Sequence, residues 1–280
     1  MNTEEIYNAV RFSHDKAEIS GSATDMVAAF RTMKKDKYDI DCMVTIANWD
    51  TNGTKPRKVD LTDGKSMARV FRPFASAYSD RLVKPMYDEK GDALIGTDGR
   101  MMLVSRIPKN LKREDAAANG FEDKDIVRWD WCCGDLTHDE YTLSSYVQMA
   151  EICKGGKLHG LLQTVGALTK AYNHEGDGVY RYLYLHIGKK CYNAVFVSEL
   201  VDGLFRLGCH TVKVCEQMDI SGGVAETKPL HLFGIGAANH DGTSIDAKGV
   251  VMPIRVGYGE SVESLGGIVF PVENGKAAAA

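Results

Sequence analysis

Apolar and polar residues alternate along the chain in a way that predicts short helices, each followed by several strands. The clearest helical pattern covers residues 62–78, where apolar side chains recur on one side at helical spacing. Pro73 lies inside this pattern and predicts a kink or break, because proline lacks a backbone donor. The same criterion predicts helices over 24–35 (with Ser22 or Thr24 as N-cap), 158–171 and the second part of 192–207, which Gly208 closes.

Strands are predicted where β-branched and aromatic residues form short runs between turn residues. These runs are residues 41–49, 83–88, 93–107, 126–133, 180–187, 211–216, 229–233, 249–256 and 267–272. Within 93–107 (ALIGTDGRMMLVSRI), Thr97-Asp98-Gly99 predicts a turn between two strands, since Asp and Gly tolerate left-handed backbone. Strict strand–helix–strand alternation is missing, which favours an α+β fold of short helices packed on antiparallel sheets.

The remaining segments are predicted to link or extend this framework. Residues 1–16 are expected to be a polar leader with one helical turn, and 109–125 a surface loop or inserted helical turn. Residues 141–153 are expected to be a helix, and 239–242 a turn. The helix would end at Gly155-Gly156, the expected domain boundary. The predicted division is therefore 1–155 (with an inserted region, 108–155), 156–265, and a tail, 266–280.

Composition narrows the class of protein. The chain has 280 residues, 44% hydrophobic and 26% charged, as in a globular protein with one large core or two domains. The net charge of −4 does not indicate nucleic-acid binding, although cations gathered on one surface can still bind DNA. Seven scattered cysteines, a polar N-terminus and the lack of a membrane-length apolar run favour a cytoplasmic protein with reduced thiols.

Patterns that indicate catalysis are weak. Gly234 and Gly236 imitate half of a dinucleotide fingerprint, but no helix is predicted after them, so a turn is favoured. A zinc or other metal site could use residues from one acidic and thiol-rich stretch: Cys132, Cys133, Asp135, His138, Asp139 and Glu140. Adjacent cysteines have poor spacing for zinc, and core thiols with a solvated loop are favoured. No nucleophile elbow is present. We therefore expect no enzyme activity, no cofactor and no metal.

Three segments occur in a suggestive order: residues 71–107, 192–204 and 249–255. Together they resemble the DNA sliding clamp family, represented by the bacterial DNA polymerase III beta subunit. Residues 71–107 are similar to its inner helix, a strand and the strand A-T-D-G-H-R-L. Residues 192–204 (YNAVFVSELVDGL) are similar to the segment that enters a Leu-rich inner helix, and 249–255 (GVVMPIR) resembles the closing V-M-P-M-R strand. Arg100 and Met101 depart from the family pattern, which often has His and Arg there. The length accommodates at most two clamp-like domains, so a ring would need three copies.

The resemblance implies two kinds of contact. Basic helices would contact duplex DNA through its phosphates without reading sequence, and the residues suited to this are Lys65, Arg69 and Arg72, with Arg31, Lys34 and Lys35 as a weaker set. An apolar cleft would bind a short peptide of a DNA polymerase or another replication or repair protein. Its walls would be Thr97, Gly99, Arg100, Met101 and Met102 with Met252, Pro253, Ile254 and Arg255. Ordinary exposed helix charges and ordinary strand residues are the alternatives.

The sequence thus predicts a homo-oligomeric processivity factor, associated with the nucleoid when bound to DNA. A second hypothesis is a clamp-fold accessory protein of phage or mobile-element origin that does not form a ring. A third is an α+β enzyme whose site the sequence does not reveal.

Overall fold

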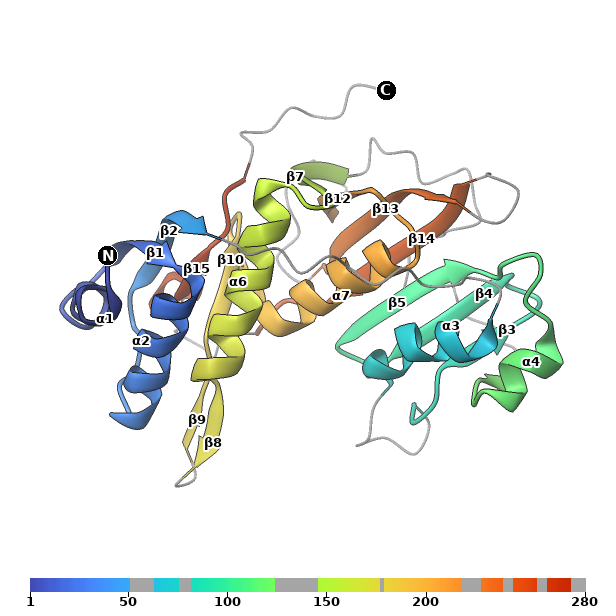
Figure 1. The fold of residues 1–280 in the computed structure, drawn as a ribbon, viewed down its shortest axis with the longest axis horizontal. Helices are drawn as coiled ribbons and strands as arrows, with labels where there is room; N and C mark the ends of the chain where they lie inside the picture. The colour runs from blue at the N-terminus through green and yellow to red at the C-terminus, as the bar shows by residue number, and fades with distance from the viewer. Residues whose placement is uncertain are drawn as a thin grey trace. The chain divides into compact units, whose positions relative to one another are not determined.

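The computed structural model describes residues 1–50, 63–75, 82–123, 146–176, 179–217, 228–238, 244–255 and 261–272, which form two compact units (Figure 1). Unit 1 contains the described residues of 1–54, 155–199 and 253–272. Unit 2 contains those of 55–154 and 200–252. Each of the expected segments 1–155 and 156–265 therefore contributes to both units. The expected strand 126–133, the expected turn 239–242 and the candidate metal ligands from Cys132 to Glu140 lie outside the described residues.

Unit 1 is built on a five-stranded sheet in the order β1-β2-β15-β10-β11. The strands are β1 (Lys16–Ser22), β2 (Met43–Asp50), β15 (Gly267–Val269), β10 (Tyr184–Ile187) and β11 (Lys190–Asn193). Every neighbouring pair is parallel except β10–β11. The expectation of antiparallel sheets is wrong for this unit. Residues 16–22 contain one Gly and two Ser, which are depleted in strands, so the sequence did not reveal the β1–α2–β2 crossover that makes the first two strands parallel.

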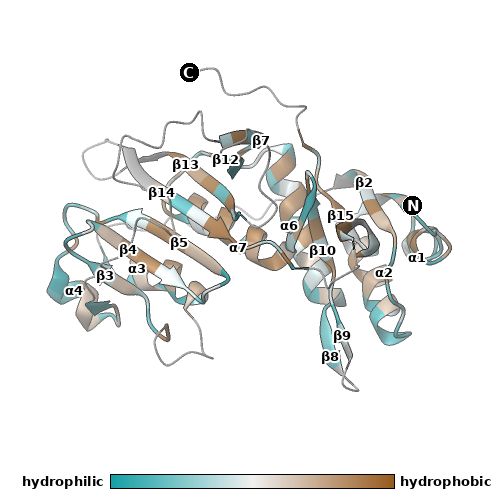
Figure 2. Ribbon diagram, turned by 180° about the vertical axis from the view of Figure 1, so that it is seen from behind, coloured by the Kyte–Doolittle hydropathy of each residue, from teal (hydrophilic) through white to brown (hydrophobic). Residues whose placement is uncertain are grey.

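Helices cover one face of this sheet. The side chains of β1 and β2 alternate, with Ala17 and Ile46 buried and Lys16 and Thr45 exposed, so only one face joins the core. Helix α2 (Ala23–Lys35) packs against α6 (Lys157–Tyr172), and the Phe30 and Tyr172 rings meet edge to face at 6.3 Å. Strand β15, in the centre of the sheet, is coloured apolar in Figure 2. This is the layered arrangement that an amphipathic helix and a half-buried strand require.

Two helices of unit 1, α2 and the N-terminal helix, begin with side-chain caps. Ser22 is the N-cap of α2, as predicted, and its hydroxyl accepts the backbone N–H of Asp25 at 3.1 Å. Residues 1–16 are more ordered than the expected polar leader, because α1 (Thr3–Arg11) is a full helix with a capping box. It buries Ile6 and Val10 completely, a two-residue apolar stripe that is easily overlooked in a polar segment.

Unit 2 is built on an eight-stranded sheet in the order β6-β3-β4-β5-β14-β13-β12-β7. The strands are β6 (Glu122–Asp123), β3 (Met86–Asp88), β4 (Ala93–Thr97), β5 (Met101–Arg106), β14 (Ser244–Val251), β13 (Leu230–Ala238), β12 (Thr211–Gln217) and β7 (Tyr146–Cys153). All neighbours are antiparallel except β3 and β6. The predicted antiparallel α+β arrangement is confirmed for this unit.

The described part of the expected helix 141–153 is instead strand β7. Ala150 and Ile152 are buried while Glu151 is exposed, which is the period-two alternation of a strand. The register with β12 shifts at Met149, and this irregularity disguises the strand pattern in the sequence.

One face of the unit 2 sheet is covered by helices. Helix α3 (Gly64–Phe71) ends where a 3-10 turn, η1 (Arg72–Phe74), begins, so the break predicted at Pro73 is confirmed. Helix α7 (Ala194–Arg206) follows β11, and Gly208 closes it with φ +96°, as predicted. Residues 200–206 of α7 belong to unit 2, where a Cβ on Gly249 of β14 would lie 3.3 Å from Leu200.

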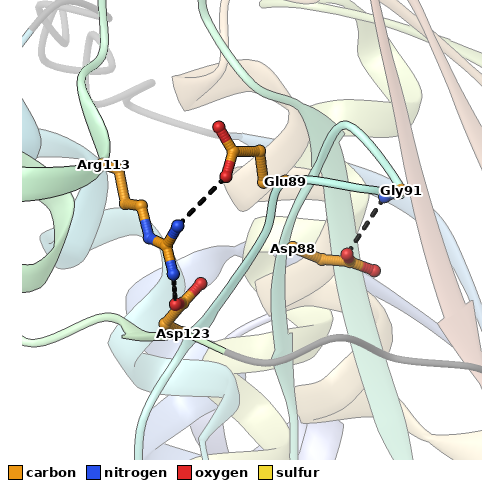
Figure 3. Close-up of polar contacts among 5 residues, drawn as sticks. All are labelled: Asp88, Glu89, Gly91, Arg113 and Asp123. Carbon is orange, nitrogen blue, oxygen red and sulfur yellow. Dashed lines mark hydrogen bonds and ion pairs between the residues drawn. The ribbon is translucent and has the colours of Figure 1, made fainter.

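Residues 109–123 contain a short helix, α4 (Arg113–Ala118), so an inserted helical turn is confirmed. Figure 3 shows how Arg113 connects this helix to its surroundings: its guanidinium pairs with Glu89 at 3.2 Å and also with Asp123 of β6. The side chains are half-exposed, so these pairs add little stability. The nearby turn is fixed from inside, because buried Asp88 accepts the N–H of Gly91 at 3.0 Å.

Candidate apolar docking surface and basic helices

The turn between β4 and β5 is held by its own side chains. The Asp98 carboxylate accepts the backbone N–H groups of Arg100 and Met101, both at 2.8 Å. The Thr97 hydroxyl accepts the N–H of Gly99 at 3.0 Å and donates to the carbonyl of Met101 at 2.8 Å. Gly99 has φ +86°, a conformation that favours glycine. The Thr-Asp-Gly sequence therefore forms a corner held by its own hydrogen bonds, with Arg100 exposed.

The Thr-Asp-Gly stretch and the stretch at 249–255, about 150 residues apart in sequence, contribute neighbouring strands to unit 2. Strand β14 pairs antiparallel with β5, with Val250 opposite Met102 and Val251 opposite Met101. One residue further on, the N–H of Met252 donates to the carbonyl of Arg100 at 2.8 Å. The structure thus brings residues 97–102 and Met252 into one region of one sheet.

The sheet face opposite α3 and α7 carries an apolar surface at this point. We call it the hairpin patch: Leu82 and Met102 over the buried side chains of Met86, Ile95 and Val104, together with Thr97, opposite Met102, and Met252, which follows Val251 of the paired strand. Leu82 and Met102 pack against the buried residues, and Met252 is 39% exposed. Sequence reasoning missed Leu82, which lies within the family-like segment 71–107 but not among the residues expected to form the cleft. A Cβ on Gly99 would lie 3.9 Å from its side chain.

The other predicted cleft residues lie elsewhere. Met101 is 5% exposed and, being opposite Val251, points to the helix-covered face, away from Met102. Pro253, Ile254 and Arg255 fall in unit 1, where the N–H of Ile254 donates to the carbonyl of Cys191 at 2.9 Å. The four residues expected to form the second wall of the cleft are therefore split between the two units, and only Met252 joins the hairpin patch.

The first predicted basic set is exposed on α3 and η1. Lys65, Arg69 and Arg72 all point to solvent, whereas Met67 and Phe71 on the other side of the helix are completely buried. Arg72 also donates to the carbonyl of Asn119 at 3.3 Å. This is the spacing of an amphipathic helix, and it leaves the three cations free of the core.

The second basic set lies on α2 in unit 1. Arg31 and Lys35 are exposed, and Lys34 is half-buried and donates to the carbonyl of Asn173 at 3.4 Å. The two basic sets therefore belong to different units.

The β7–β14 half of the unit 2 sheet contains a buried cluster of polar and aromatic side chains that sequence patterns did not reveal. The ammonium group of Lys248, 0% exposed, lies 5.0 Å from the Phe233 ring centroid and 5.9 Å from that of Tyr146. His231 stacks on Phe233 and meets Tyr146 edge to face at 4.9 Å. Burial raises the pKa of the neighbouring Cys215 thiol to about 12, so it is a poor nucleophile at neutral pH.

None of the helices in the described ranges is long and apolar enough to cross a membrane. Comparison of the chain with protein-family models, curated proteins and solved structures finds no match.

Proposed function

We propose that the chain is a non-enzymatic, clamp-like DNA processivity or accessory factor. It contacts duplex DNA through exposed basic helices and docks partner peptides on the hairpin patch. The observation that carries this proposal is the direct pairing of β5 with β14, because the family resemblance requires those two distant stretches to form one binding surface.

DNA binding is tested first by its salt dependence. Contacts between cations and phosphates release counterions, so each lost contact reduces the slope of log affinity against log salt by about 1. Replacing Lys65 and Arg69 with Glu is expected to reduce the slope by about 2 on a duplex of any sequence. The matched control replaces Lys16 and Lys189, exposed cations of unit 1, with Glu. An equal decrease of the slope in both variants would mean that only the net charge of the protein matters, and it would exclude α3 as the helix that contacts DNA.

Peptide docking is tested at the hairpin patch. The variant Met102→Ala/Met252→Ala is expected to bind a terminal peptide of the replicative polymerase from the same source at least tenfold more weakly, about 1.4 kcal/mol. The control is Ile235→Ala, another exposed apolar residue of unit 2, at 38% exposure. Unchanged binding in the double variant would exclude this surface.

The second candidate function is a clamp-related accessory protein that forms no ring. The mostly parallel sheet of unit 1 favours it, because the resemblance implies antiparallel sheets in every clamp domain. Light scattering at high protein concentration separates the two candidates. A closed trimer supports the ring, and a monomer at every concentration supports the accessory protein.

A further inference from the structure

Three tyrosines of unit 1 form a regular stack that the proposed function does not use. Tyr180 of β9 (Val179–Arg181), Tyr182, and Tyr184 of β10 lie at alternate positions of one extended segment. The ring centroids of Tyr180 and Tyr182 are 6.0 Å apart with an interplanar angle of 3°, and those of Tyr182 and Tyr184 are 6.0 Å apart at 24°. We call these three residues the tyrosine ladder.

The ladder faces solvent although its rings are largely apolar. Tyr180 is 56% exposed and Tyr182 is 42% exposed, and both rank among the most exposed large apolar side chains in the described part of the chain. Tyr184 is half-buried on the sheet face that the helices leave open, opposite Gly267, which has no side chain to cover it. Strand β9 pairs antiparallel with β8 (His174–Gly176), and this hairpin extends beyond the five-stranded sheet (Figure 1), so the ladder runs from the sheet onto the hairpin.

The residues between the tyrosines hold the ladder in place. Leu183 is 0% exposed, and its N–H donates to the side-chain carbonyl of Asn173 at 2.6 Å. Arg181 points away from the rings and pairs with Asp39 at 2.9 Å. Because alternate side chains are fixed to the body of unit 1, the rings are pre-organised, which lowers the entropic cost of binding.

The exposed area decides what size of partner fits. Tyr180 and Tyr182 together expose roughly the surface of one whole tyrosine, about 200 Å². A stable protein–protein interface buries about 800 Å² on each partner. The ladder is therefore too small to hold a dimer by itself, and it suits a short segment of another chain.

The charge beside the tyrosine ladder and the width of the ladder determine which kind of chain segment it can bind. Single-stranded nucleic acid stacks on aromatic rings but needs cations along its backbone. Here the residue directly across the hairpin from Tyr180 is Glu175, whose carboxylate accepts a hydrogen bond from the Tyr180 hydroxyl and raises the pKa of that tyrosine. A helical peptide docks through a stripe two side chains wide, whereas the ladder is a single file flanked by Glu175 and Asn193.

An extended peptide suits both the acidic neighbour Glu175 and the single file of rings. Side chains on one face of an extended strand repeat every 6.6 to 6.8 Å, close to the 6.0 Å spacing of the ladder rings, so two successive side chains of that face can each pack on the exposed edge of a ladder ring. Aromatic side chains gain from edge-to-face or offset contact with tyrosine rings beyond the area that they bury. We propose that the tyrosine ladder binds an extended peptide segment with aromatic residues at two alternate positions and a basic residue beside them, facing Glu175.

The experiment uses the full chain and short labelled peptides followed by fluorescence anisotropy. The probe carries Phe at two alternate positions in a Ser/Lys background, and the comparison peptides carry Leu at those positions or Phe four residues apart. Two aromatic contacts predict that the alternate-Phe peptide binds about tenfold more tightly than the Leu peptide. Tyr180→Leu/Tyr182→Leu is expected to abolish this preference, whereas Tyr180→Phe/Tyr182→Phe is expected to keep it.

Phe12→Leu is the matched control, because Phe12 is 70% exposed just after α1 of the same unit and lies outside the ladder. Circular dichroism of each variant checks that the fold is unchanged. Equal binding of Phe and Leu peptides, or tighter binding of the peptide with Phe four residues apart, would overturn the proposal. Tighter binding of a single-stranded oligothymidylate than of any peptide, lost in the Tyr→Leu variant, would overturn it as well.

Discussion

Strand β4 closely approaches the end of helix α3 at Gly96. A Cβ added at this position would lie 2.6 Å from the carbonyl oxygen of Phe71 and 3.0 Å from the Cβ of Phe74. Contacts shorter than 3.0 Å to backbone atoms cannot be relieved by rotating a side chain, so the helix end or the strand must move. The Gly96→Ala variant therefore tests the packing that joins α3 to the Thr-Asp-Gly hairpin.

Two effects of opposite sign set the magnitude. Overpacking a tight contact costs about 1 to 3 kcal/mol. Alanine also has less conformational freedom in the unfolded chain, which returns about 0.4 to 1 kcal/mol. The net expectation is that Gly96→Ala lowers the free energy of unfolding by about 1 to 2 kcal/mol. The basic residues of α3 would shift with the helix end.

Urea unfolding followed by circular dichroism measures this difference as a lower midpoint at unchanged slope. The control is Gly155→Ala, where φ is +74° and nothing lies within 4 Å, so only backbone strain changes. A Gly96→Ala midpoint equal to or above that of the wild type would refute the close approach of β4 to Phe71.

One helix cap and three buried titratable side chains give further expected outcomes. Ser22→Ala removes the N-cap of α2 and is expected to lower the unfolding free energy by about 1 kcal/mol in thermal unfolding. Alkylation at pH 8, mapped by mass spectrometry, is expected to label exposed Cys153 well before Cys191 and Cys215, because burial raises the pKa of these two thiols to about 11 and about 12; equal labelling would contradict their burial. Burial also raises the pKa of Tyr172 from 10.0 to about 12, so the folded chain holds this proton more tightly than the unfolded chain. The stabilisation that this proton gives is complete below pH 10 and is lost as the pH rises toward 12. In the Tyr172→Phe variant, the free energy of unfolding should therefore fall less steeply between pH 10 and pH 12.

Local chemistry made several elements predictable. The Ser22 cap, the break at Pro73 and the glycine after α7 depend on interactions within a few residues, and the structure confirms all three. The Thr-Asp-Gly turn was predictable for the same reason, since Asp98 and Thr97 satisfy the backbone groups of the turn themselves. Strand β7 was not, because the register shift at Met149 breaks its alternation and the reason for that shift lies in its partner strand.

The sequence alone determined which stretches form the helix ends, the turn and the apolar and basic sides of the helices, because these depend on side-chain type and short spacing. Only the tertiary structure decided the sheet order: parallel pairing of β2 with β15, and of β15 with β10, joins segments more than 80 residues apart. It also decided the hairpin patch. Met102 and Met252 share a surface because β5 and β14 pair in one register, and a shift of a single residue would turn Met101 outward in place of Met102.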